Sequence, residues 1–172
     1  MLRILSDLTS VDGRFEPIHS KEGVTAIVDY AHTPDALQNV IGTINEIRKK
    51  DQRPYVVVGC GGNRDATKRP EMAKIAVDGS DMAVLTSDNP RLEEPGANIE
   101  QSESPGWSRC AYPAMTDRRE AIKAAVAPVR PGDIILVAGK GHETYQDRRR
   151  REAPLRRPGG GARGVRDGAS RA

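Results

Sequence analysis

The amino-acid sequence predicts an α/β fold in which a mostly parallel sheet is flanked by helices. Short apolar runs alternate with segments of helical period in the order βαβαβαβ, which favours right-handed crossovers and parallel strands. In addition, a polar loop punctuated by glycine or proline follows each of four apolar runs. In a parallel sheet these loops leave the same carboxyl edge, where open α/β folds bind their ligands.

The first half of the chain supplies a strand pair, a helix and a buried strand. Residues 15–18 and 24–28 are short strand candidates separated by a polar turn. Thr33-Pro34 suits the N-cap and first position of a helix that runs to about residue 49. The run at 55–58 is continuous and β-branched, as in a strand covered on both faces. The apolar face of the helix comprises Leu37, Val40, Ile41, Ile44 and Ile47.

The second half continues the alternation. Pro70 opens a second helix with Met72, Ile75 and Ala76 on its apolar face, and residues 82–86 form the next strand. A third helix is predicted over 117–129, and residues 134–138 form the last strand. The elements together predict a Rossmann-like sheet. The side chains expected to point inward from the third helix are Ile122, Ala125, Val126 and Val129.

Two segments do not follow this pattern. A crossover between residues 95 and 114 needs a helix, yet Ser102 to Trp107 shows no helical period. After Gln146 the apolar content gives way to arginine and glycine, which cannot bury a core. We therefore expect residues 147–172 to be disordered.

Length, charge and composition limit the class of protein. A chain of 172 residues is long enough for one domain with a core. The net charge of +3 comes from the tail: from Asp147 onward there are nine arginines and three acids, which leaves the preceding body at −3. Without aromatic residues between the basic ones, we do not expect nucleic-acid binding.

The chain contains no apolar stretch near the ~20 residues of a membrane span, and residues 1–8 lack the core of a signal peptide. We expect a cytoplasmic monomer that binds no membrane. Cys60 and Cys110 form no disulfide framework and are expected to be reduced thiols. The histidines are too scattered to predict a metal site: they are His19, His32 and His142.

The first two loops carry polar groups suited to a nucleotide or phosphate. Asp29 and His32 lie where a strand ends and a helix begins, so they could orient a ribose or phosphate near the helix terminus. Alternatively, they cap the local turn. Residues 59–62 are glycine-rich and allow close approach of a ligand, but no Walker A loop occurs in the sequence. Arg64, Lys68 and Arg69 add positive charge there, or form a solvated basic turn.

The other two loops suggest an amino-acid ligand. In Asp88-Asn89-Pro90-Arg91, proline stiffens the loop and arginine offers a bidentate grip on a carboxylate. The loop at 139–143 adds the acid Glu143. Arg64 and Arg91 set against Asp88 and Glu143 would complement a ligand that carries both carboxylate and amine. The alternative is a set of surface salt bridges, each worth only ~0–1 kcal/mol.

These motifs give the chain a resemblance to a known family. It resembles the carboxy-terminal domain of the Mur ligases, specifically those that add meso-diaminopimelate to a UDP-N-acetylmuramoyl dipeptide in peptidoglycan synthesis. The similarity runs over residues 13–146 with an interruption at about 96–114, and it leaves 1–12 as a residual interdomain linker. The motifs that carry it are residues 28–37, 59–70, 86–91 and 138–146.

The resemblance implies roles for individual residues. Arg14, Asp29 and His32 would face ATP. An arginine in the Asp-Asn-Pro-Arg motif is the mark of family members that use meso-diaminopimelate rather than lysine, which fits a distal carboxylate that needs a cation. The residues that would contact meso-diaminopimelate are Arg64, Asp88, Asn89, Pro90, Arg91, Gly139 and Glu143.

In the Mur ligases, ATP converts the carboxylate of the UDP-linked dipeptide into an acyl phosphate, which the incoming amine attacks. ATP and Mg²⁺ would be held mainly by the central domain, which this chain lacks together with the UDP-sugar domain. We therefore expect no catalytic residue, no metal ligand and no ligase activity in this chain alone. A stand-alone amino-acid-binding module and an inactive gene fragment remain as alternatives.

The tail at 147–172 departs from the family. Mur ligases of this type usually continue into a stretch like Phe-Asp-Asp-Arg-Glu-Val-Ala. Residues 155–162 can be encoded as CTT CGA CGA CCG GGA GGT GGC GCG, and the same string read one base later encodes that stretch. We hypothesise a frameshift near residues 148–151, which the nucleotide sequence would test.

Overall fold

The computed structural model describes residues 13–63, 65–102, 114–143, 145–148 and 151–154. The linker at 1–12, Arg64, and most of the hypothesised frameshifted tail lie outside the described residues. Within them, a five-stranded sheet has the order β1-β2-β5-β3-β4. Only β1 is antiparallel to its neighbour. The strands are β1 (Glu16–His19), β2 (Thr25–Asp29), β3 (Pro54–Cys60), β4 (Met82–Ser87) and β5 (Ile134–Ala138).

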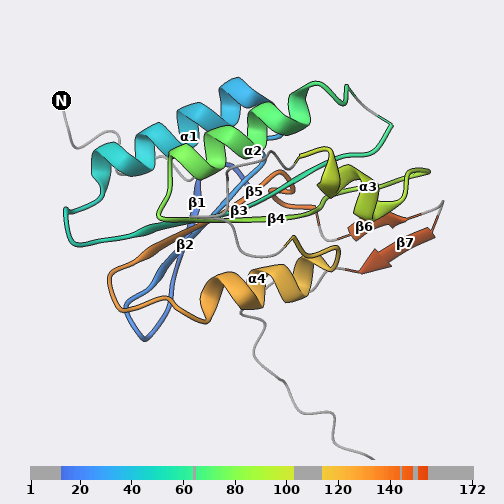
Figure 1. Cartoon of the computed structure of the whole chain (residues 1–172). Helices are drawn as coiled ribbons and strands as arrows, with labels where there is room; N and C mark the ends of the chain where they lie inside the picture. Colours follow the sequence, from blue (N-terminus) through green and yellow to red (C-terminus); the bar gives the residue numbers. More distant parts are fainter. Residues whose placement is uncertain (1–12, 64, 103–113, 144, 149–150, 155–172) are drawn as a thin grey trace, which may run out of the picture.

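Helices cover both faces of this sheet, which confirms the predicted α/β class (Figure 1). Helices α1 (Pro34–Ile47) and α2 (Lys68–Asp78) pack side by side on one face, and α4 (Arg118–Val126) covers the other. The last parallel strand, β5, inserts between β2 and β3. As a result, the loops after β2, β5, β3 and β4 are consecutive neighbours along one edge.

The helix starts follow from local capping. The hydroxyl of Thr33 accepts a hydrogen bond from the Ala36 amide at 3.3 Å, and Pro34 occupies the first turn. At the start of α4, the Asp117 carboxylate accepts from the amides of Arg119 and Glu120 at 2.8 and 3.2 Å. Such caps satisfy amide groups that have no partner within the helix.

The core is divided by the sheet. On the α4 face, Ala121 and Ala125 pack against Val57 and Val84. The opposite face holds the larger cluster, in which Leu37 and Ile44 of α1 are almost fully buried. The central strand β3 is buried on both faces, as its β-branched sequence predicted.

Two apolar side chains do not lie where the sequence predicted. Val126 was expected to point inward but is 47% exposed, because it lies one residue beyond Ala125 and therefore about 100° around the helix. The helix also ends at Val126 rather than at Val129. Ile47 is 60% exposed because it is the last residue of α1.

Three elements were not anticipated. Helix α3 (Pro95–Glu100) has six residues, too few to show a period, and it packs beside β4. Strands β6 (Tyr145–Arg148) and β7 (Arg151–Pro154) pair antiparallel in a separate two-stranded sheet. Residues of both strands fall within 147–172, and the prediction of disorder for that segment as a whole stays a prediction. Residues 155–172 lie outside the described part.

Candidate functional site

A cavity of about 380 Å³ lies at the carboxyl edge of the sheet, where the loops after β2, β3, β4 and β5 meet. Every one of the four predicted loops contributes to its wall. The lining residues are Tyr30, His32, Thr33, Gly59, Cys60, Gly61, Asp65, Lys68, Arg69, Met72, Asp88, Asn89, Arg91, Gly139 and Glu143.

The loop after β4 brings Asp88, Asn89 and Arg91 to the cavity. Asp88 and Pro90 are buried, and Arg91 is half-buried. The backbone of Arg91 has a φ of 53°, in the left-handed region that L-residues seldom adopt. Its guanidinium donates through Nη1 to the Gly62 carbonyl at 2.7 Å. One edge of the guanidinium is thus anchored to the loop after β3.

The loop after β5 contains a buried lysine that organises the acids. Lys140 is 4% exposed, and its ammonium lies 3.1 Å from both Asp88 Oδ1 and Glu143 Oε2. It also donates to Asn89 Oδ1. Glu143 accepts a further hydrogen bond from the Tyr30 hydroxyl at 3.1 Å. The acid cluster is therefore tied to a cation of this chain.

The ionisation of this cluster follows from these contacts. Desolvation raises the pKa of Glu143, but hydrogen bonds from Lys140, Tyr30 and Asn89 outweigh it, and the net pKa is lowered. Desolvation lowers the pKa of the fully buried Arg118, while the carboxylates of Asp88 and Glu143 oppose that shift. Arg118 donates to the Ala138 carbonyl at 2.6 Å, at the end of β5. It is a second internal cation beside the acids.

The loop after β2 is held by backbone hydrogen bonds to the Asp29 carboxylate. Asp29 does not line the cavity; its Oδ2 accepts from the Phe15 amide and its Oδ1 from the Ala31 amide, both at 2.7 Å. These contacts match the turn-capping alternative for Asp29. His32 is exposed, lines the cavity, and contacts the Tyr30 carbonyl through Nδ1 at 3.0 Å. Arg14 is exposed and is not part of the cavity wall.

The glycines after β3 serve chiefly to pack two loops together. A Cβ on Gly59 would lie 2.4 Å from the Thr86 carbonyl oxygen, and one on Gly62 would lie 2.0 Å from that of Pro90. Both positions exclude any side chain. Gly59 and Gly61 both line the cavity, so the close approach to a ligand expected for this loop is available at these two glycines.

The cavity therefore gathers many of the residues that the sequence singled out, including Arg91 and Glu143, which lie far apart in the chain. Pro90, Asp29 and Arg14 are not among the residues that line it, and Arg64 is outside the described residues. Sequence reasoning missed Lys140 and Arg118 as site residues and took Arg69 only as a nearby charge.

A signal for the buried arginines was present in the sequence. Arg69 precedes Met72, Ala73 and Ala76 on the buried face of α2. Arg118 precedes Ala121 and Ala125 in the same way on α4. A charged residue at a core-facing helix position is rarely left unpaired, so such a position indicates an internal partner.

Neither a metal centre nor a membrane segment is found in the described part of the chain. There, no three acids, histidines or cysteines come together in a way that could hold an ion, and no helix is long and apolar enough to span a bilayer. Cys60 is a free thiol in the cavity wall, and burial, followed by the charge of Asp88, raises its pKa to about 11.

Known proteins are similar to the part of the chain that carries the cavity. The family model described as Mur ligase, glutamate ligase domain, matches residues 13–141. The UDP-N-acetylmuramoyl-L-alanyl-D-glutamate–2,6-diaminopimelate ligase of Parabacteroides distasonis is 54% identical over 86% of this chain and 31% of that protein. The ligase of the same name from Listeria monocytogenes is 50% identical over 84% of this chain and 29% of its own length.

Solved structures agree with the sequence matches. A structure of UDP-N-acetylmuramoyl-L-alanyl-D-glutamate–2,6-diaminopimelate ligase is similar with a TM-score of 0.73 and 39% identity, over 87% of this chain and 30% of that one. Folylpolyglutamate synthase from Thermotoga maritima, at 18% identity and a TM-score of 0.57 over 76% of this chain and 28% of that one, shows the fold alone. The chain thus spans less than a third of the curated relatives named here.

Proposed function

Because the chain belongs to the Mur ligase family and matches its glutamate ligase domain, we propose that it is the amino-acid-binding domain of a meso-diaminopimelate-adding ligase. The whole enzyme would join meso-diaminopimelate to UDP-N-acetylmuramoyl-L-alanyl-D-glutamate at the expense of ATP, in the cytoplasm. The observation that carries the proposal is the placement of Arg91 in one cavity wall with the acid cluster of Asp88 and Glu143. Identity near 50% to ligases of that name supports it.

Each group of the ligand has a counterpart in the cavity. A carboxylate would receive hydrogen bonds from the guanidinium edge of Arg91 that is not engaged with Gly62. A ligand ammonium would donate hydrogen bonds to the side-chain oxygens of Asp88, Asn89 and Glu143. These oxygens would then be shared between the ligand and Lys140. Gly139 and Pro90 shape the backbone around these groups. Arg64 remains a ligand contact proposed from its motif.

The nucleotide is proposed to bind mainly outside this chain. The sequence has no Walker A loop. ATP and Mg²⁺ would therefore belong to the larger part of the relatives that this chain does not match. Arg14 and His32, which are exposed, would face ATP across that boundary. Asp29 would act indirectly, since both of its carboxylate oxygens bind backbone amides.

Titration of meso-diaminopimelate into the 172-residue chain tests the binding role. We expect Arg91→Ala to weaken binding by roughly 2–5 kcal/mol, as for the loss of one partner of a buried charge pair. The matched control is Arg130→Ala, an exposed arginine at the opposite end of the sheet, which should bind like wild type. Equal affinity of wild type and Arg91→Ala would remove Arg91 from the site.

A coupled assay, read together with the titration, separates a binding domain or module from an inactive fragment. With ATP, Mg²⁺, meso-diaminopimelate and the UDP-linked dipeptide, we expect this chain alone to release no phosphate and form no amide bond. Binding without turnover is the result for a domain or a stand-alone module, and absence of binding is the result for an inactive fragment. Amide formation by the isolated chain would contradict the proposal that ATP is held elsewhere.

A further inference from the structure

Arg91 and Asn63 both hold a backbone conformation that ordinary residues avoid. Their φ angles are 53° and 52°, and they lie in the loops after β4 and β3. Asparagine tolerates the left-handed region through local hydrogen bonds, but arginine has no such compensation. Residues in disfavoured backbone regions persist only when their surroundings hold them there. The contacts around Arg91 must therefore supply the restraint.

The first restraint is a set of hydrogen bonds that join the two loops. The Leu92 amide donates to Asn63 Oδ1 at 3.0 Å, and the Gly62 amide donates to the Asn89 carbonyl at 2.8 Å. The Glu93 amide closes a turn on the Pro90 carbonyl at 3.0 Å. These bonds fix the backbone on both sides of Arg91.

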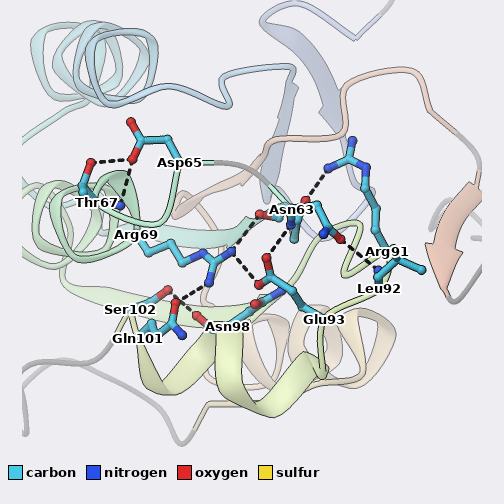
Figure 2. Close-up of polar contacts among 12 residues, drawn as sticks. Asn63, Asp65, Thr67, Arg69, Arg91, Leu92, Glu93, Asn98, Gln101 and Ser102 are labelled. Atoms are coloured by element: carbon cyan, nitrogen blue, oxygen red, sulfur yellow. Dashed lines mark hydrogen bonds and ion pairs between the residues drawn. The ribbon is translucent and has the colours of Figure 1, made fainter.

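The second restraint is a partly buried ion pair, between Arg69 and Glu93, that joins the same two loops. Arg69 is 2% exposed, and its Nη2 donates to Glu93 Oε2 at 2.7 Å and to the Gly61 carbonyl at 3.4 Å (Figure 2). The other oxygen of Glu93 accepts from the Asn63 amide at 2.5 Å. Through Nη1, Arg69 also donates to the Gln101 side chain. One arginine thus ties α2, both loops and the end of α3.

The two cavity-lining arginines, Arg69 and Arg91, therefore differ in how their guanidinium groups are hydrogen-bonded within the chain. The terminal nitrogens of Arg69 are both engaged by groups of this chain, whereas among the described residues the Arg91 guanidinium has a hydrogen bond only to Gly62. Desolvation raises the pKa of Glu93, but hydrogen bonds from Asn63 and Arg69 outweigh it and the net pKa is lowered. The Glu93 carboxylate is therefore charged, as the pair with Arg69 requires.

We propose that Arg69 and Glu93 are positioning residues that aim Arg91 at the ligand and thereby set the preference for a diamino acid with a second carboxylate. This inference rests on the proposed binding of meso-diaminopimelate, and it concerns residues that would act on the ligand through Arg91. Because the planar guanidinium fork must match a carboxylate in angle as well as distance, a loop that is free to shift loses that match. Lysine, which has no distal carboxylate, does not depend on it.

The test compares two ligands on four single variants and one double variant of the chain. We expect Arg69→Met and Glu93→Gln to weaken meso-diaminopimelate binding roughly 10- to 100-fold while leaving lysine binding unchanged. Glu93→Gln keeps the shape of the side chain and serves where Arg69→Met fails to fold. Lys74→Met, an exposed cation on the same helix, is the control and should change neither affinity. In an Arg91→Ala background, Glu93→Gln should have no further effect.

A second readout does not require binding. Steady-state ¹⁵N nuclear Overhauser effects report the order of the Arg91 and Leu92 amides, and we expect them to fall in Glu93→Gln and Arg69→Met but not in Lys74→Met. Equal losses for both ligands, additive effects with Arg91→Ala, or unchanged amide order would each overturn the positioning role. If wild type binds neither ligand, the proposed function fails for this chain, and the amide order alone decides the positioning role.

Discussion

Replacement of Lys140 by methionine is the sharpest test of how the site is held together. Methionine keeps a similar length and fills the same space, but it removes the ammonium that contacts Asp88, Asn89 and Glu143. The lysine is 4% exposed and Asp88 is 9% exposed, so water cannot readily replace the lost charge. Two carboxylates would be left together without their shared cation.

The magnitude follows from burial. Removal of one partner of a buried ion pair costs about 3–5 kcal/mol, compared with about 0–1 kcal/mol for a surface pair. Arg118 still lies near both carboxylates, which favours the lower end of that range. At about 2–4 °C per kcal/mol for a chain of this size, Lys140→Met should lower the melting temperature by roughly 6–20 °C.

Urea unfolding followed by circular dichroism measures this loss, with Lys74→Met as the control. Lys74 forms an exposed pair with Asp78 on α2, so its replacement should cost only about 0.3–0.5 kcal/mol. A double variant, Lys140→Met with Glu143→Gln, should recover part of the stability because it removes one of the unpaired charges. A loss below about 1 kcal/mol for Lys140→Met would refute the assignment of a buried, functional ion cluster.

The pH dependence provides a second check on the same variant. The net pKa of Glu143 is lowered in the folded state. The Glu143 carboxylate therefore contributes stability that is fully present above its unfolded pKa of about 4.3. That stability is lost as the pH falls through the pKa of Glu143 in the folded state. Lys140→Met removes that contribution. The stability difference between wild type and variant should be largest near pH ~7 and shrink below about pH 4. A constant difference across that range would contradict the reasoning.

Two further predictions concern groups away from the ligand contacts. Asp133 accepts hydrogen bonds from Arg53 and from the Arg130 amide, which outweigh desolvation and lower the pKa of Asp133. Asp133→Asn should therefore lower the free energy of unfolding in urea by about 1.5–3 kcal/mol. It should also flatten the loss of stability that wild type shows below about pH 3.9. Arg53→Lys, which keeps the charge without the fork, should cost less. Cys60, with its pKa raised to about 11, should react with iodoacetamide at pH ~8 on the order of 100-fold more slowly in the folded chain than in urea, as measured by peptide mass spectrometry. Equal rates would show that the thiol is not buried.

The order of elements and their starts could be predicted from the sequence because the signals are local. Thr33 and Asp117 cap helices through their own side chains, and β3 shows its two-sided burial in an unbroken apolar run. The meeting of four loops at one edge follows from parallel pairing, whatever the order of the strands. Helix α3 could not be predicted, because six residues are too few for periodicity to differ from chance.

The internal partners of the charged residues could not be predicted in the same way. Whether Lys140 faces solvent or contacts Asp88 depends on the insertion of β5 between β2 and β3, which is a property of the whole topology. The sequence suggested that the acids were available to a ligand, and the structure shows that a lysine of the chain already contacts them. Arg69 and Arg91 differ in the same way: Arg69 is paired with Glu93 of the chain, whereas Arg91 donates a hydrogen bond only to a backbone carbonyl within the described residues.

This arrangement has a consequence for ligand selection. Asp88 and Glu143 are balanced by Lys140 and Arg118, so the acid side of the cavity is close to neutral before any ligand arrives. A ligand ammonium must compete with Lys140 for the same oxygens, and its net gain on binding is therefore small. A ligand carboxylate at Arg91 meets a guanidinium whose only hydrogen bond within the described residues is to a backbone carbonyl. Discrimination between diamino acids should then depend on the carboxylate more than on the amine.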